Sequence, residues 1–187
     1  MLSQFKKIIK AVFISGALMI PFGVAAQGMD DPQVDGFTHE ITIYTTGWII
    51  ASTTADGNLA AWFSRTGDTT YRLHIRCKLL SDNYDHYRVS RGSHVLLKLV
   101  DNSLITLPVM TDVEAGILEI KGSSYTTQYW DATMVFYMSR DDIYKISQAD
   151  FTGARVEADD KYIDLGMTPK QSLVLNKLAA LMLSQNN

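Results

Sequence analysis

The sequence predicts an α+β domain in which an antiparallel β-sheet of about seven to nine strands, in one arrangement a sandwich, carries a short helix and a C-terminal helix. Three observations support this fold class. Short segments from residue 39 to residue 138 alternate apolar and polar side chains and are separated by turn residues. Two capping-box motifs then open segments with helical periodicity. No repeat of fixed period occurs, which argues against a repeat architecture.

Residues 1–26 have the three parts of a cleavable signal peptide. Three lysines precede an apolar stretch over residues 11–20, and small residues at 24–26 suit signal peptidase. We therefore expect cleavage after Ala26 and export to the periplasm or beyond the cell. The alternative is an uncleaved membrane anchor, because no charged residue occurs from 11 to 29.

The chain that follows the signal peptide is acidic. It holds 161 of the 187 residues, with 14 basic against 20 acidic side chains and a net charge of −6. Such a charge repels phosphate backbones, so we expect no nucleic-acid partner. We assign residues 27–37 to a flexible N-terminus and residues 38–187 to a single domain, with no later membrane span. The oligomeric state stays open.

The strand pattern fills the first two thirds of the domain. Asp56-Gly57-Asn58, Thr66-Gly67-Asp68 and Asp101-Asn102-Ser103 are turn signals, and Asp-Asn tolerates the positive φ of a tight hairpin. Pro108 ends a strand because its nitrogen cannot donate to a ladder. We predict neither a strand nor a helix for residues 114–123. The expected strands are 39–45, 48–50, 59–65, 70–80, 95–100, 104–107 and 125–138.

The last third of the chain changes to helical patterning. Ser139 and Asp142 form one capping box, and Thr168 and Gln171 form a second with Pro169 at the first helical position. Segments 153–158 and 161–165 between them are expected to pair as strands. The second helix is expected to run to about Ser184, with an apolar stripe of Val174, Leu178, Leu181 and Met182.

Cys77 is the one cysteine of the chain, which excludes an intramolecular disulfide. Alternation places Cys77 on the same strand face as Leu73 and Ile75, so we expect a small buried hydrophobe. His74 points to the opposite face, which argues against a local Cys–His catalytic pair.

The remaining chemistry-bearing residues give no catalytic signature. The four histidines lack zinc-ligand spacing, and residues 82–85 fit a surface turn better than a calcium loop. We expect no catalytic residue, no metal and no cofactor, and the sequence favours a protein that is not an enzyme.

Aromatic side chains in one strand are the candidate binding residues. They are Tyr125, Tyr129 and Trp130. Alternation places the two tyrosines on one face and Trp130 on the other. Aromatics of this kind stack on sugars or anchor a protein partner, although strands also favour them for their own packing.

Three stretches together carry a family resemblance. They are Tyr71 to Leu80, Leu96 to Leu107, and Met138 to Leu165. The order of a long strand, a hairpin, a capped helix, a strand pair and a terminal helix resembles small exported proteins of Bacteroidota-type bacteria with no characterised function. The resemblance covers most of residues 39 to 183. It implies an exported domain of this fold and supplies no catalytic residues.

The sequence favours an exported, non-catalytic domain that binds a protein or glycan partner at the cell envelope. One alternative is an envelope-acting hydrolase or small-ligand carrier, with a concave site that includes Asp85, His86 or His94. A second is an inhibitor or immunity-type protein with an exposed aromatic or acidic patch. Titratable groups that converge in a deep pocket would contradict the favoured hypothesis.

Overall fold

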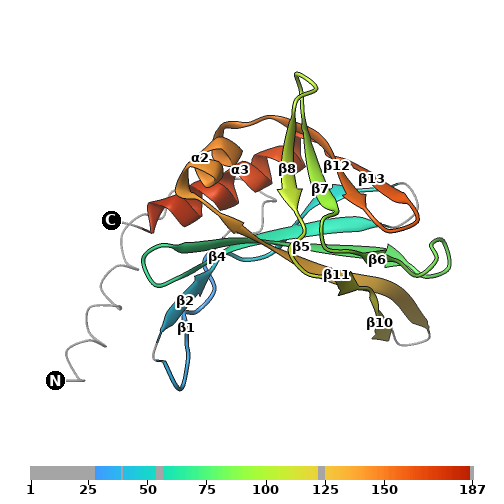
Figure 1. Cartoon of the computed structure of the whole chain (residues 1–187), viewed down its shortest axis with the longest axis horizontal. Coiled ribbons are helices and arrows are strands. Elements are labelled where there is room, and N and C mark those ends of the chain that lie inside the picture. The colour runs from blue at the N-terminus through green and yellow to red at the C-terminus, as the bar shows by residue number, and fades with distance from the viewer. Residues whose placement is uncertain (1–27, 39, 54–56, 122–124, 186–187) are drawn as a thin grey trace.

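The computed structural model describes residues 28–38, 40–53, 57–121 and 125–185 (Figure 1). The predicted signal peptide and its cleavage site lie outside the described residues. Within these ranges, no helix has the length and apolar character needed to cross a bilayer.

The fold is α+β, as predicted, and almost all of its strands belong to one antiparallel sheet. The sheet has eleven strands, more than the seven to nine expected, and a separate pair joins β6 to β9. Two helices within the described residues, α2 (Arg140–Gln148) and α3 (Pro169–Ser184), complete it. The strands are β1 (Gln33–Val34), β2 (Ile41–Tyr44), β3 (Trp48–Ser52), β4 (Asn58–Thr66), β5 (Thr70–Leu80), β6 (Arg88–Val89), β7 (His94–Leu99), β8 (Leu104–Pro108), β9 (Val113–Glu114), β10 (Gly116–Lys121), β11 (Thr126–Met138), β12 (Phe151–Glu157) and β13 (Tyr162–Gly166).

The additional strands are those with weak sequence signals. β1, β6 and β9 have two residues each, and β10 is exposed on nearly all its positions, so it lacks the alternation that marks a half-buried strand. The N-terminal segment, expected to be flexible, forms β1 against β2 and bridges Met29 to Thr45. Backbone pairing therefore holds part of this segment on the domain.

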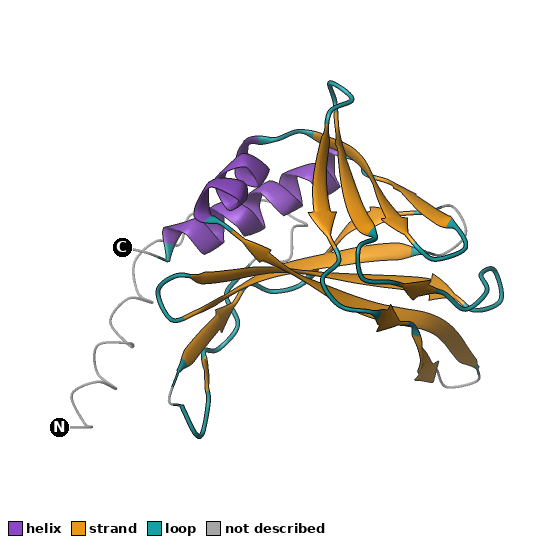
Figure 2. Ribbon diagram, in the orientation of Figure 1, coloured by secondary structure: helices purple, strands orange, loops and turns teal. Residues whose placement is uncertain are grey.

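The sheet folds over on itself, so that β7, β8, β12 and β13 cross above β4, β5 and β11 (Figure 1). β13 joins the two halves by pairing Gly166 with Ser52 of β3. The core lies between the halves and includes Phe63, Leu97 and Phe136. α3 packs on β3, β4 and β12, and α2 packs on α3 (Figure 2).

The buried face of α3 is rotated slightly from its predicted stripe. Leu178 and Met182 are buried as expected, while Val174 and Leu181 are half-buried and Leu175 is fully buried. Both capping boxes are confirmed, because Ser139 Oγ accepts the Asp142 N–H at 3.1 Å and Thr168 Oγ1 accepts the Gln171 N–H at 3.3 Å. These caps fix where each helix begins.

β5 shows the predicted alternation over its whole length, with odd-numbered residues buried and even-numbered ones half-exposed. Cys77 is fully buried, and the Tyr87 hydroxyl donates a hydrogen bond to its carbonyl oxygen at 2.7 Å. Burial raises the pKa of the Cys77 thiol to about 12. Cys77 is therefore the small buried hydrophobe expected, and His74 lies on the other face.

Candidate functional site

Two of the strand edges that have no neighbouring strand among the described residues are those of β8 and of the end of β11. β8 pairs only with β7, and the order of strands ends there. β10 pairs with residues 126–131 of β11, so residues 132–138 of that strand have β5 on one side and no strand on the other. The fold brings these two edges to opposite sides of one pocket.

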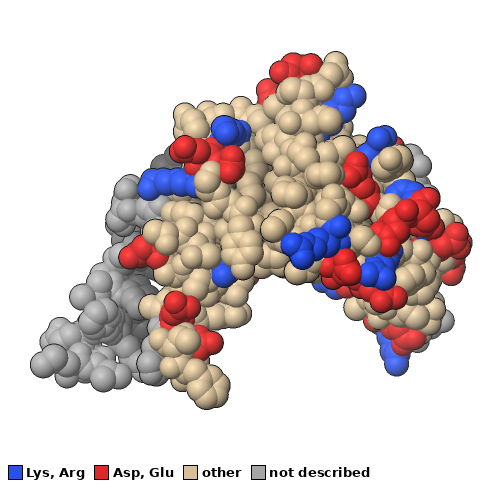
Figure 3. Space-filling model, viewed as in Figure 1, with Lys and Arg blue, Asp and Glu red and all other residues tan. Residues whose placement is uncertain are grey.

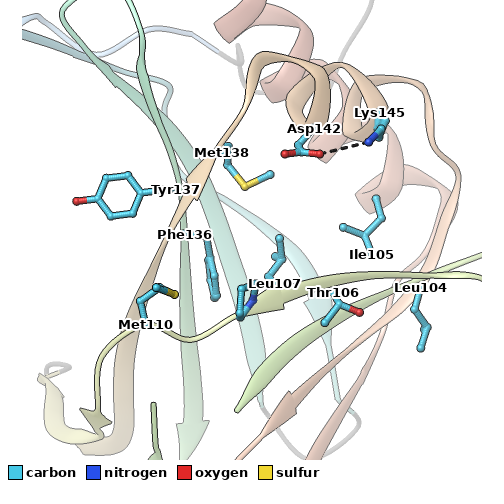
Figure 4. Close-up of a pocket in the computed structure, with 11 residues that line it drawn as sticks. Leu104, Ile105, Thr106, Leu107, Met110, Phe136, Tyr137, Met138, Asp142 and Lys145 are labelled. Atoms are coloured by element: carbon cyan, nitrogen blue, oxygen red, sulfur yellow. Dashed lines mark hydrogen bonds and ion pairs between the residues drawn. The ribbon is translucent and has the colours of Figure 1, made fainter. Parts of the chain in front are cut away.

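This pocket, which we call the gap, has a volume of about 440 Å³ and lies between β8, the end of β11 and α2 (Figure 4). Its volume is within the range of ligand-binding pockets, roughly 300–1,000 Å³. Figure 4 shows Phe136 and Leu107 side by side at its floor, and Tyr137 directed away from them. The lining residues are Leu104, Ile105, Thr106, Leu107, Pro108, Met110, Phe136, Tyr137, Met138, Asp142 and Lys145.

The edge of β8 directs backbone groups into the gap. The Val109 N–H donates to the Ser93 carbonyl oxygen at 2.8 Å, and the Leu99 N–H donates to the Ser103 carbonyl oxygen at 2.9 Å. Residues of an antiparallel pair alternate between bonding the partner strand and pointing away from it. The N–H and C=O groups of Leu104 and Thr106 therefore point away from β7.

The same reasoning applies to β11. The Ser81 N–H donates to the Gln128 carbonyl oxygen at 3.0 Å, in the register that β5 and β11 keep throughout. Even-numbered residues of β11 therefore bond to β5, and odd-numbered residues point their backbone groups the other way. Thr133, Val135 and Tyr137 lie beyond the reach of β10, so their N–H and C=O groups point to the free side of the strand, and of the three Tyr137 lines the gap.

The charged side chains that line the gap neutralise each other. Lys145 Nζ lies 3.4 Å from Asp142 Oδ1, as the dashed line in Figure 4 marks. Asp142 also belongs to the cap of α2, and its hydrogen bond with the Ser139 side chain is the main cause that lowers the pKa of its carboxyl. Both groups therefore have structural partners, and they sit at the α2 end of the pocket.

Away from Asp142 and Lys145, the surface around the gap is apolar and uncharged. Large hydrophobic side chains are exposed here, with Leu104 and Met110 each 54 % and Tyr137 69 % accessible. Figure 3 shows a continuous uncharged surface over the middle of the molecule, where β8 and β11 face the viewer, with charged side chains gathered to either side. Exposed apolar clusters of this kind mark interaction sites.

The free edges of β8 and of residues 132–138 in β11 also lack the charges that usually protect a strand edge. Proteins place lysines, prolines or bulges on such edges to prevent pairing with other chains. On β10, Glu119 and Lys121 provide such charges. On β8 the one such residue is Pro108, at the end of the strand, and residues 132–138 of β11 carry no charge. The gap is therefore open to further pairing.

The three predicted binding residues do not form one cluster. Tyr125 is exposed and precedes β11, and Lys78 lies over the Tyr129 ring at 4.3 Å. The Trp130 indole donates its Nε1–H to the Tyr84 carbonyl oxygen at 2.9 Å on the other face of the strand. None of the three lines the gap. Their role in binding stays a prediction.

Tyr129 belongs to a different surface, which we call the outer face: the side of β2, β4, β5 and β11 opposite α3. Directly opposed residues in paired strands share a face, so the register defines its members. Its ring-bearing and charged residues are Tyr44, Trp62, Arg72, His74, Arg76, Lys78, Tyr129, Asp131 and Tyr137.

The residues expected in a hydrolase or carrier site form separate local pairs. His86 Nε2 lies 3.1 Å from the Ala115 carbonyl oxygen, and His94 Nδ1 lies 2.8 Å from Glu157 Oε2. Both histidine side chains are about 40 % exposed, and neither lines the gap. In the part of the chain that the structure describes, no three His, Cys, Asp or Glu side chains are placed to hold a metal ion.

The gap could not be predicted directly from the sequence, although one signal was present. The outward positions of β8 and of residues 132–138 are uncharged, which is unusual for two strands that end at free edges. Searches of protein-family models, curated proteins and solved structures find no match for this chain. Geometry and chemistry alone therefore support the site.

Proposed function

We propose that this protein is an exported, non-catalytic binding domain that takes an extended segment of a partner protein into the gap. The observation that carries the proposal is the free edge of β11 beside an apolar pocket. An added strand would pair with the backbone of Thr133, Val135 and Tyr137. Its alternate side chains would enter the pocket over Phe136 and Leu107.

β11 is the better of the two edges for this pairing. It presents three consecutive outward residues, all with backbone N–H groups, whereas β8 ends at Pro108, which has none. Main-chain hydrogen bonds give such complexes affinity, and side-chain pockets give them specificity. The pair formed by Asp142 and Lys145 at the end of the gap would limit how far the segment extends.

A carrier of a small apolar ligand is the second candidate, because the volume of the gap also fits a small molecule. The two candidates differ in their use of the backbone. A peptide strand needs the outward N–H groups of β11, whereas an apolar small molecule needs only the pocket. The Val135→Pro experiment described below separates them.

A photo-crosslinking amino acid at Met110, in cells that produce the protein, tests the proposal. Met110 lines the gap and is 54 % exposed. We expect a discrete protein adduct from this position and none from the same group at Tyr162, which is 65 % exposed on β13. Equal adducts from both positions, or no adduct from Met110, would contradict the proposal.

Val135→Pro in the Met110 crosslinking protein then tests the mode of binding. The Val135 N–H points away from β5 to the free edge of β11, so this change leaves the ladder with β5 intact, and proline is tolerated where an N–H faces outward. We expect loss of the protein adduct, while Val135→Thr, which keeps the N–H, retains it. An adduct with the mass of a small molecule that survives Val135→Pro would favour the carrier instead.

A further inference from the structure

The outer face is a second surface, which meets the gap at Tyr137, and its charge is unlike that of the whole chain. The chain carries a net charge of −3. The outer face carries Arg72, Arg76 and Lys78 on alternate residues of β5, and alternate residues share a face. Among the described residues of β4, β5 and β11 that face this way, Asp131 is the one carboxylate. The surface is therefore locally basic.

One of the three cations is neutralised and two are not. Arg76 forms a bidentate pair with Asp131, with hydrogen bonds of 2.7 and 2.5 Å. Arg72 donates to the Thr66 hydroxyl at 2.8 Å, and no described carboxylate lies within ion-pair distance of it or of Lys78. Two cations on a folded surface thus remain available to an anionic ligand.

Each cation without a carboxylate partner lies against an aromatic ring. The Arg72 guanidinium is 5.2 Å from the Tyr137 ring centroid, and Lys78 Nζ is 4.3 Å from that of Tyr129. Between them, the Trp62 and His74 rings stack with centroids 5.1 Å apart and planes 7° from parallel. The surface therefore alternates cationic groups with flat rings along the strand.

The shape and span of this surface indicate a polymer. Because α3 covers the opposite side of β4, the outer face points toward the hollow in the lower outline of Figure 3, between the β1–β2 and β10–β11 ends. Arg72 and Lys78 are six residues apart on β5, which corresponds to about 20 Å at about 3.4 Å per residue. A ligand that meets both cations must therefore be an oligomer.

We propose that the outer face binds an acidic polysaccharide, with carboxylate or sulfate groups at Arg72 and Lys78 and sugar rings on the aromatic side chains. The apolar faces of sugar rings suit flat aromatic platforms, and arginine forms bidentate hydrogen bonds with carboxylates. Two available cations suit a polymer with spaced acidic groups better than a phosphate backbone with one charge per nucleotide.

Binding of the purified protein to an immobilised oligogalacturonate that spans more than about 20 Å tests this proposal. We expect binding that weakens as the ionic strength is raised from about 0.05 to about 0.2 M, and none to neutral dextran. Arg72→Gln and Lys78→Gln should each weaken binding by about tenfold. Tyr129→Ala should weaken it as well, with Tyr129→Phe close to the unchanged protein.

Arg155→Gln is the matched control. Arg155 is also an arginine on a strand over a tyrosine, but it is paired with Asp164 on the other half of the sheet. We expect unchanged binding in this variant. Equal loss in Arg155→Gln, no binding to oligogalacturonate, or equally tight binding of single-stranded DNA would each overturn the proposal. Met110 lies in the gap, so failure of its crosslinking would leave this result unaffected.

Discussion

The gap and the outer face share strand β11 but offer a ligand different chemistry. In the gap, unpaired backbone groups face an apolar pocket whose charged side chains are paired with each other. On the outer face, the strands are hydrogen-bonded to each other and the chemistry lies in charged and aromatic side chains. Val135 lies where they meet, because its side chain is on the outer face and its N–H points to the free edge of β11 that borders the gap. Under the two proposals, β11 serves two recognition modes because only part of its length has a strand on both sides.

Substitutions of two neighbouring residues of β11 should differ most in how far they lower the free energy of unfolding. Phe136 is buried at the floor of the gap, whereas Tyr137 is 69 % exposed. Phe136→Ala should lower the free energy of unfolding by about 3–5 kcal/mol, because it leaves a cavity in the core. Tyr137→Ala should lower it by less than about 1 kcal/mol. Chemical denaturation measures both, and similar losses would show that the two residues are not on opposite faces.

The pH dependence of stability between pH 6.5 and about 4 should report His74 of the outer face. Burial, and next the charge of Arg72, lowers the pKa of His74 from 6.5 to about 4. Between these values the unfolded chain binds a proton that the folded protein does not, so stability should fall as pH drops from 6.5 to about 4. Denaturation across this range checks the slope. His74→Gln should flatten it, and an unchanged slope in that variant would assign it to other groups.

Loss of the α2 cap should lower the stability by a smaller amount, and the effect should be confined to the rim of the gap. Ser139→Ala removes the side chain that accepts the Asp142 N–H and should cost about 1 kcal/mol of stability. Amide hydrogen exchange should show faster exchange in α2 and no change in β5. Faster exchange in both would mean that the helix and the outer face unfold together.

A charge at Val135, which lies where the two sites meet, should give the smallest change, and the change should appear in ligand affinity. Val135→Lys adds a cation to the outer face and places a charge beside the free edge of β11, where charges disfavour strand pairing. Binding of oligogalacturonate should strengthen by about threefold and occupancy of the gap should fall by a similar factor. Affinity measurements at both sites check this. Changes in the same direction would contradict the separation of the two sites.

Much of the fold could be predicted from local patterns. β5 was visible because its apolar residues alternate over its full length, and both helices were visible from Ser139 and Thr168 at their caps. β10 was missed because an exposed edge strand needs no apolar alternation. Such signals lie within a few residues of each other, which is why a single sequence reveals them.

The sites could not be predicted in the same way, because they depend on contacts distant in sequence. Arg76 meets Asp131 across 55 positions, and the floor of the gap combines Leu107 with Phe136. Tyr129 was singled out as a candidate, and it lies on the outer face, but its neighbour Lys78 follows from the pairing of β5 with β11. Only the register of the sheet gives these residues a common location.

Because Cys77 is buried, the rate at which a thiol reagent labels it measures how often β5 becomes exposed. A thiol reagent reacts with the thiolate, which burial disfavours here, and must also reach a fully buried sulfur. Labelling of the unmodified protein should therefore proceed at the rate at which β5 becomes exposed. A ligand in the gap or on the outer face that stabilises the fold should slow that labelling, so one cysteine can measure occupancy of either site without an added probe.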